Sequence, residues 1–364
     1  MEHDLQRRRL LKTGSTGIGG ALLMASVVAR ASDNLQADVT EAPPQVLPLQ
    51  GFGGVRLASC EFPDRSALAV GVVIDSGQVI DVAAEARRFG MRLVFDAGSM
   101  LSLLAAGEPA MRQIESLIEK AKRARARTVP IHQVRFYSPI PRPHSNIYCV
   151  GWNYLDHFEE GKNARADKAV SSYPEHPVFF TKGVHTMNHP LGTIPFETGN
   201  TDTADWEAEL AVIIGKRGRD ITEDMAMDFV FGYSAFNDTT VREIQQKRHG
   251  GQWFKGKSLD GYGPMGPWIV TKAGVALDDV RIICRVNGVE KQNASYQQMY
   301  FKIPRIIAEL SRGLTLEPGD IIATGTPSGV GFARKPPEFL KPGDVMETEV
   351  TGVGKFSNTV REKA

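Results

Sequence analysis

The sequence predicts an α+β protein, mostly β, in which a small N-terminal α+β domain precedes a larger mixed β-roll or barrel-like domain. Beyond residue 145 the chain consists mainly of short β-branched runs separated by Gly and Pro turns. Pro-Gly-Asp occurs at 318–320 and 342–344, each time before an apolar run, which indicates turns leading into strands. Helical stretches are few and isolated, so the pattern favours a roll or barrel over an alternating βαβ fold.

The composition is that of an ordinary globular protein. Of 364 residues, 42% are hydrophobic and 23% are charged, which excludes wholesale disorder. A formal net charge of +1 gives no support for nucleic-acid binding, which usually needs a basic domain or stripe. The three widely spaced cysteines, Cys60, Cys149 and Cys284, argue against a disulfide framework but leave one bridge open.

Residues 1–31 predict a twin-arginine signal peptide. Arg7 and Arg8 are followed by x-Leu-Leu-Lys, a weakly apolar stretch rich in Gly and Ala, and an A-x-A cleavage pattern at 29–31. The apolar stretch is short for a permanent membrane anchor. We therefore expect a periplasmic or secreted protein that has no membrane attachment after cleavage. A disordered basic tail is the alternative.

Three further segments complete the expected organisation. Residues 32–51 are polar and contain prolines, which indicates a linker. Residues 52–140 predict the small domain, with a β-meander followed by helices in AAEARRFGMRL and AMRQIESLIEKAKRARA, the second ending in a solvated basic terminus. Residues 141–364 form the expected catalytic domain, with helices at VREIQQKR (241–248) and IPRIIAELSRG (303–313).

The segment DWEAELAVIIGK (205–216) places two carboxylates on one face of an expected strand. Residues two apart in a strand point to the same side, so Glu207 and Glu209 share a face, opposite an apolar one. Two like charges in a partly buried site repel, and a divalent cation with hard oxygen ligands would resolve the repulsion. Taken alone, the pair fits a surface strand with one solvated face at least as well.

A third carboxylate follows the strand-like run in VFGYSAFNDTTVREIQ. Asp238 ends this run, and Thr239 and Thr240 are expected to cap the helix that follows. A carboxylate at a strand end is a suitable third ligand. The simpler alternative is that Asp238 is a helix N-cap.

Three other stretches carry reactive groups. In NYLDHFEEGK, His157 and Glu160 are three apart, on one face of a helical turn, where a carboxylate makes an imidazole a better base. WFKGKSLDGYGPMGPW places Lys255 and Lys257 in a Gly-rich, aromatic context. TLEPGDIIATGTPSGVG delivers a buried strand into a loop around Thr326, whose hydroxyls and N–H groups could bind an oxyanion. A surface turn with scattered charges is the alternative for the first stretch.

Taken in order, these stretches resemble the fumarylacetoacetate hydrolase family. The matching motifs are G-x-N-Y-x-x-H-x-x-E, the E-x-E strand, G-Y-x-x-x-N-D-x-T-x-R-x-x-Q, G-K-S-x-D and P-G-D-x-I-x-T-G-T-P-x-G-V-G, spread over residues 145–360. The resemblance implies a mixed β-roll, commonly in a homodimer, and a divalent metal, Mg²⁺ with Mn²⁺ or Ca²⁺ as alternatives. Asn153 stands where the fumarylacetoacetate-cleaving members offer another carboxylate, which favours the acylpyruvate and oxaloacetate branch.

The resemblance also assigns roles to individual residues. Glu207, Glu209 and Asp238 would hold the metal. His157 and Glu160 would form a water-activating dyad on a mobile lid over about 155–176, with Lys257 as a further catalytic group. The substrate's carboxylate and keto oxygens would be bound by Tyr154, Arg242, Gln245 and Thr326.

The expected function is a metal-dependent hydrolase that cleaves a C–C bond in a 2,4-diketo acid of the acylpyruvate or fumarylpyruvate type. The metal would chelate the C1 carboxylate and C2 keto oxygen, and His157 would deprotonate a water that attacks C4. A decarboxylase or an isomerase of related keto acids, such as oxaloacetate or hydroxymuconate, stays open because the same chelate stabilises the same enolate. A non-catalytic exported binding protein is the alternative from another class.

Overall fold

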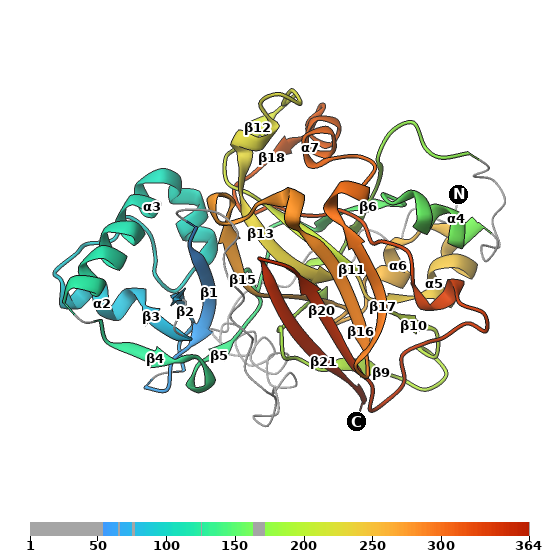
Figure 1. Ribbon diagram of the computed structural model, residues 1–364, viewed down its shortest axis with the longest axis horizontal. Helices are drawn as coiled ribbons and strands as arrows, with labels where there is room; N and C mark the ends of the chain where they lie inside the picture. The colour runs from blue at the N-terminus through green and yellow to red at the C-terminus, as the bar shows by residue number, and fades with distance from the viewer. Residues whose placement is uncertain (1–53, 65, 75–76, 125, 163–171, 364) are drawn as a thin grey trace, which may run out of the picture. The chain divides into compact units, whose positions relative to one another are not determined.

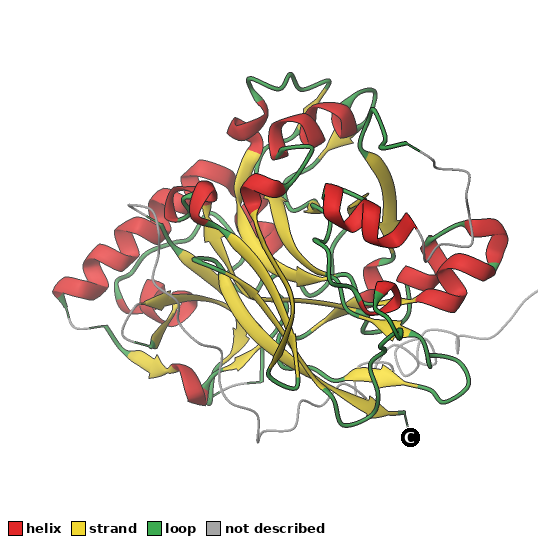
Figure 2. Cartoon of the chain, turned by 45° about the vertical axis from the view of Figure 1, so that its right-hand side comes forward, coloured by secondary structure: helices red, strands yellow, loops and turns green. Residues whose placement is uncertain are grey.

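The computed structural model describes residues 54–64, 66–74, 77–124, 126–162 and 172–363. The predicted signal peptide (1–31) and linker (32–51) lie outside these residues. Strands form most of the regular structure, and helices lie to their sides (Figures 1 and 2). No helix in the described ranges is long and apolar enough to span a bilayer. The predicted mixed, mostly β fold is confirmed.

One large sheet supports the site. Its order is β4 (Thr128–Pro130), β3 (Gln78–Asp81), β2 (Ala69–Ile74), β1 (Arg56–Glu61), β15 (Gly263–Thr271), β13 (Val230–Asn237), β11 (Ala208–Ile214), β19 (Ile321–Ala323), β6 (Ile147–Gly151) and β7 (Val178–Lys182). Two short strands pair beside it, β5 (Arg135–Phe136) with β1 and β8 (Met187–Asn188) with β15. Most pairs are antiparallel, but β19–β6 and β15–β8 are parallel, and the order does not close into a barrel.

A second sheet packs against this one. Its order is β17 (Val289–Ser295), β16 (Arg281–Val286), β20 (Val345–Val350), β21 (Gly354–Glu362) and β9 (Ile194–Phe196). Two further strand pairs are β10 (Ala204–Asp205) with β14 (Thr240–Val241) and β12 (Gly218–Arg219) with β18 (Thr315–Leu316). Both Pro-Gly-Asp turns precede strands as predicted, with Gly319 and Gly343 in the left-handed region at φ 97° and 93°.

The helices are short, apart from α3. They are α2 (Val82–Arg88), α3 (Met100–Arg123), α4 (Leu155–Lys162), α5 (Arg242–Lys247), α6 (Phe254–Lys257) and α7 (Ile303–Ser311). Single 3₁₀ turns lie at Ile131–Gln133, Val184–Thr186, Ala226–Phe229, His249–Gly251, Lys272–Gly274, Leu277–Asp279, Tyr296–Gln298 and Gly331–Ala333. The helix expected through AAEARRFGMRL ends early, at Arg88, because Gly90 adopts φ 61° just beyond it.

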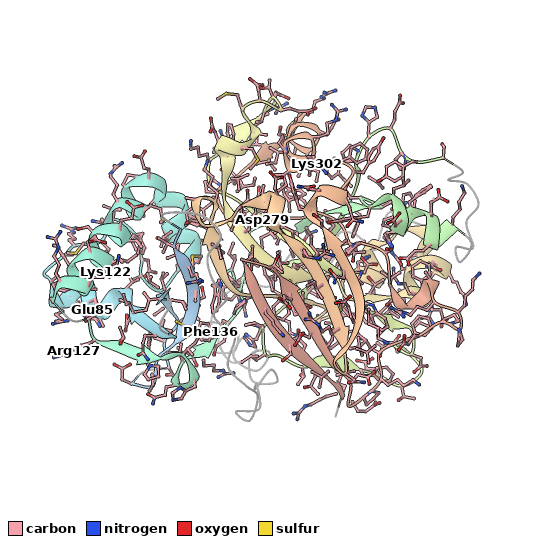
Figure 3. The ribbon with its side chains drawn as sticks, in the orientation of Figure 1. Glu85, Lys122, Arg127, Phe136, Asp279 and Lys302 are labelled. Carbon is pink, nitrogen blue, oxygen red and sulfur yellow. The ribbon has the colours of Figure 1, made fainter. Side chains whose placement is uncertain are left out.

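The N-terminal strands continue the sheet that carries the site. Residues Arg56 and Leu57 of β1 pair with Val270 and Ile269 of β15, and α2 and α3 pack on one face of β1–β3 (Figure 1). Lys122 at the end of α3 is exposed and pairs with Glu119, as expected of a solvated terminus (Figure 3). The predicted domain boundary between residues 140 and 141 stays a prediction.

Both faces of β11 are buried. Leu210 and Val212 belong to one hydrophobic cluster, and Ala211 and Ile213 belong to another on the opposite side. The predicted alternation of faces is therefore correct, whereas the alternative of a solvated face is wrong. The three cysteines are buried and form no disulfide, so the bridge that the sequence left open is absent.

Candidate metal centre and active site

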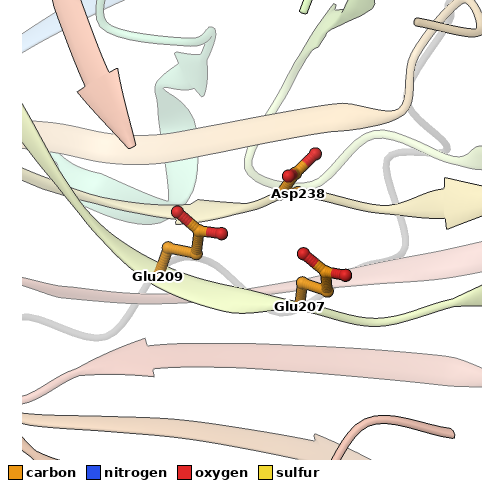
Figure 4. Close-up of side chains that lie close together, drawn as sticks. All are labelled: Glu207, Glu209 and Asp238. Atoms are coloured by element: carbon orange, nitrogen blue, oxygen red, sulfur yellow. The ribbon is translucent and has the colours of Figure 1, made fainter. Parts of the chain in front are cut away.

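Two adjacent strands bring the three predicted metal ligands together (Figure 4). Glu207 directly precedes β11, Glu209 lies within it, and Asp238 directly follows β13. The antiparallel register pairs Ala208 with Asn237, and the Asp238 N–H donates to the Glu207 carbonyl at 2.8 Å. As a result, one oxygen from each of the three carboxylates lies within 4.8 Å of the others.

Burial makes this carboxylate cluster electrostatically costly. Glu207 is 4% exposed, Glu209 1% and Asp238 0%. Burial, followed by the charges of Asp238 and Glu207, raises the pKa of Glu209 well above its ordinary value. Burial also opposes ionisation of Glu207, but Lys257 and then Arg242 outweigh it and lower the pKa of Glu207 to about 2.

Protein cations neutralise part of the cluster. Buried groups of opposite charge form an alternating series, which runs Asp205, Arg242, Glu207, Lys257, Asp238 and Lys182. Successive members lie 2.7 Å apart between nitrogen and oxygen. Among the described residues Glu209 has no such cation and accepts only the Gly325 N–H, at 2.8 Å. Glu209 is thus the carboxylate of the cluster without an ion-pair partner among the described residues, and it is stabilised only by the more distant charge of Lys257 and by the Gly325 N–H.

The cluster fits a divalent cation. Its donors are all carboxylate oxygens, which suit Mg²⁺, Mn²⁺ and Ca²⁺, and their mutual repulsion falls when a cation lies between them. A purely structural network of ion pairs would give each of the three carboxylates a cation from the protein. Glu209 has no such cation among the described residues, which supports a bound ion at this position. Glu207, Glu209 and Asp238 would hold the ion, and the choice of Mg²⁺ stays a prediction.

Metal affinity should rise with pH. Because its pKa is raised, Glu209 keeps its proton to a higher pH than an ordinary carboxyl when no metal is bound. Metal binding must displace that proton, so affinity should fall by up to about tenfold per pH unit below this pKa. At a pH below this pKa, calorimetric titration with Mg²⁺ in two buffers of different ionisation enthalpy should show release of up to one proton per ion. Affinity that is independent of pH would contradict this account.

The predicted dyad is assembled on α4. His157 Nδ1 and Glu160 Oε1 lie 2.9 Å apart, and Glu160 Oε2 accepts the Gly329 N–H at 2.8 Å. The second contact ties α4 to the loop after β19 and fixes the carboxylate that orients the imidazole. Residues 163–171 of the expected lid lie outside the described residues.

The loop after β19 serves the site through its backbone. Gly325 donates its N–H to Glu209, and the hydroxyl of Thr326 donates to the Ala208 carbonyl at 3.0 Å. The N–H groups of Gly325 and Gly329 bind carboxylates of the site itself, and binding of a substrate oxyanion by this loop stays a prediction. Gly325 has φ 100°, and a Cβ there would lie 2.7 Å from the Asn153 side chain, so only glycine fits.

Most of the predicted residues converge on one pocket. It is lined by Val150, Gly151, Trp152, His157, Phe180, Glu207, Arg242, Gln245, Gln246, Gly251, Trp253, Lys257, Thr326 and Phe332. Arg242 Nη1 donates to Gln245 Oε1 at 3.2 Å, while Arg242 Nη2 is buried without a hydrogen-bond partner in the described protein. That open donor suits a substrate carboxylate. Lys255, in contrast, is exposed away from the lining.

Two residues of the first motif lie elsewhere. Tyr154, expected to bind substrate, is 2% exposed and does not line the pocket, and its backbone forms a β-bridge with Met299. Asn153 makes its hydrogen bonds to backbone groups: its amide donates to the carbonyls of Phe301 and Thr324 and accepts the Phe301 N–H. The amide therefore fastens two loops together, a task that a carboxylate could not perform because it lacks a donor.

The expected helix caps after β13 are wrong. The chain forms the short strand β14 at Thr240–Val241 before α5 begins at Arg242, with Val241 at the N-cap and no side-chain cap. Thr239 donates to the Asn237 side chain and Thr240 to the Asp238 carbonyl. The alternative that Asp238 is a helix N-cap is excluded, since its carboxylate faces Lys257 and Lys182.

Sequence reasoning missed three polar residues of the site. Lys182 ends β7, Asp205 anchors Arg242 and accepts the N–H groups of Gly331 and Phe332, and Gln292 donates to Thr326 at 2.7 Å. Asp205 is the first residue of the segment DWEAELAVIIGK, but nothing in its spacing separates it from a strand-end aspartate. Lys182 and Gln292 carry no local signal, since their contacts come from tertiary packing.

The β-rich fold places three buried carboxylates beside a histidine–glutamate pair, a donor set that suits a divalent cation. The chain belongs to the fumarylacetoacetate hydrolase family, because residues 146–361 match the family model described as fumarylacetoacetate (FAA) hydrolase, C-terminal.

Known relatives support the same placement. The chain is 40% identical over 313 residues to oxaloacetate tautomerase YisK of Bacillus subtilis (strain 168), which covers 84% of this chain and 100% of the relative. The structure of the present chain is similar to that of fumarylacetoacetate hydrolase from Exiguobacterium antarcticum, with a TM-score of 0.68 and 36% identity. The match covers 85% of this chain and 100% of that structure. Maleylpyruvate hydrolase from Sphingobium sp. SYK-6, in complex with manganese(II) and pyruvate, gives TM-score 0.64, 28% identity and the same coverage.

Proposed function

We propose that this chain is a divalent-metal-dependent tautomerase that interconverts the enol and keto forms of oxaloacetate or a closely related 2-keto acid. The observation that carries the proposal is the position of His157: it lines the same pocket as Arg242 and Lys257, and Glu160 holds its Nδ1. The 40% identity to an oxaloacetate tautomerase supports it. The expected C–C hydrolysis becomes the second candidate, with the likeness to maleylpyruvate hydrolase in its favour.

A group of the chain supplies the proton that C3 receives. Ketonisation breaks the enol O–H bond, whose proton passes to solvent, and forms a C3–H bond, so the composition of the substrate and its oxidation state do not change. With Nδ1 held by Glu160, the Nε2 of His157 is the ring nitrogen left to exchange a proton with C3. Arg242 Nη2 would bind the C1 carboxylate, and Lys257 would add positive charge beside O2. When bound, a divalent cation supplies further positive charge that offsets the charge developing on O2.

Product analysis separates the candidates. Enol oxaloacetate would be diluted into buffer with Mg²⁺- or Mn²⁺-loaded protein, while the loss of enol absorbance is followed and the products are identified by NMR. A tautomerase yields keto oxaloacetate faster than metal and buffer alone. Pyruvate and carbon dioxide would instead indicate decarboxylation, and pyruvate plus a carboxylic acid from an acylpyruvate would indicate hydrolysis. No acceleration of enol loss would refute the proposal.

Export by the twin-arginine route is a separate proposal. Replacing Arg7 and Arg8 together by lysine should retain the folded protein in the cytoplasm, because the route recognises the paired arginines. Cell fractionation with immunodetection gives the measurement. The matched control is Arg9→Lys, which keeps the pair intact and should still be exported. Equal export of the double variant would disprove the route.

The homodimer that the family implies stays a prediction.

A further inference from the structure

Three aromatic side chains form one side of the pocket. Trp152 follows β6, Phe180 lies on β7, and Trp253 precedes α6. The ring centres of Trp152 and Trp253 lie 4.9 Å apart and those of Trp253 and Phe180 lie 5.2 Å apart, both edge to face. All three line the pocket, and we call them the aromatic wall.

These rings differ from tryptophans that serve only the core. Trp206 and Trp268 are fully buried, and their indole N–H groups donate to the carbonyls of Gly329 and Val353. The three rings of the wall are only partly buried. Apolar ring surface left open beside a site is typical of ligand recognition, since closing it against a planar ligand removes that surface from water.

The backbone is adapted to keep the wall in place. Trp152 has φ 56°, a left-handed conformation that costs a bulky residue roughly 1–2 kcal/mol. At Gly151 a Cβ would lie 2.6 Å from Cζ3 of Trp253, so any side chain there would displace the indole. Trp152 and Gly151 both line the pocket. Strained backbone conformations such as that of Trp152 cluster at functional sites.

The wall begins directly beside the charged end of the pocket. Lys257 Nζ lies 5.1 Å from the centre of the Phe180 ring and 2.7 Å from Glu207 and Asp238. The cations of the described lining are Lys257 and Arg242, and both are paired with carboxylates at that charged end. A 2-keto acid whose carboxylate and keto oxygen lie there can place an apolar ring on C3 against the aromatic wall.

We propose that the site also accepts 2-keto acids that carry a planar aromatic ring on C3, the arylpyruvates, with the ring packed on the aromatic wall. This inference rests on the proposed tautomerase function and adds a substrate class to it. The reaction is the same proton exchange: the enol O–H bond breaks, a C3–H bond forms, and no other reactant is needed. Planarity favours the enol, in which the ring, C3 and C2 lie in one plane.

Phenylpyruvate is the probe that tests this inference. The Mg²⁺-loaded wild-type protein should accelerate the ketonisation of both enol phenylpyruvate and enol oxaloacetate. In Trp253→Leu, and separately in Phe180→Leu, the ratio of kcat/KM for phenylpyruvate to that for oxaloacetate should fall about tenfold, as expected from the loss of one aromatic contact and its buried area. Phe254→Leu is the matched control, because Phe254 is 44% exposed, adjacent to Trp253 and outside the lining, so its ratio should equal that of the wild type.

The outcomes separate the two proposals. If the protein accelerates the ketonisation of enol oxaloacetate but not that of enol phenylpyruvate, the inference is overturned and the tautomerase function still stands. Acceleration of neither substrate overturns the proposed function itself. A ratio that stays unchanged in both wall variants also overturns the inference. Thermal melting checks folding, and if Trp253→Leu has no cooperative transition, Phe180→Leu decides the result.

Discussion

Replacing His157 by alanine should lower kcat for enol–keto exchange by roughly 10²–10⁴-fold while leaving metal affinity close to that of the wild type. The side chain lines the pocket but is not one of the three clustered carboxylates, so it serves proton exchange and not ion binding. Glu160→Gln should give a smaller loss, because the amide can still hold Nδ1 without stabilising the imidazolium charge. Stopped-flow loss of enol absorbance and calorimetric metal titration give the two measurements.

The control for this prediction is His132→Ala, since His132 is exposed on a 3₁₀ turn outside the pocket. It should retain both activity and metal binding. If His157→Ala remained fully active, the proton-exchange role would have to pass to another group. If it lost the metal, His157 would be a ligand or would support one.

The second large effect concerns the metal site. Glu209→Gln should weaken metal binding by at least about 100-fold, because it removes one of the three proposed ligands and a negative charge that has no ion-pair partner among the described residues. In the metal-free protein the same change should not lower stability. The raised pKa means that the buried site favours the neutral form of Glu209 over the charged form, and glutamine is neutral while its oxygen can still accept the Gly325 N–H.

Urea unfolding with and without Mg²⁺ tests both parts together. The wild type should gain stability with added metal, as expected for a ligand that binds only the folded state, and Glu209→Gln should gain almost none. Glu347→Gln is a suitable control, because Glu347 pairs with Arg285 and Lys355 on the second sheet, outside the carboxylate cluster. A metal response in Glu209→Gln equal to that of the wild type would rule out the cluster as the binding site.

Local spacing explains why part of the site could be predicted from the sequence. His157 and Glu160 meet because residues three apart share a helix face, and their 2.9 Å contact confirms the spacing. Glu207 and Glu209 share a side because strand residues alternate, and the two hydrophobic clusters around β11 confirm that alternation. The predicted caps at Thr239 and Thr240 failed because tertiary pairing drew this segment into β14 with β10.

The sequence by itself determined the mostly β class, the family and the three carboxylates, because these depend on residue type and on separations of a few positions. Only the tertiary structure decided what neutralises and what surrounds them. Lys257 reaches Glu207 across 50 residues, Arg242 reaches Asp205 across 37, and the aromatic wall joins segments that no periodicity connects. The physical reason is that strand pairing and burial determine which residues become neighbours, and no local pattern in the sequence specifies either. Burial then brings ordinary side chains together as a charged site beside an apolar wall.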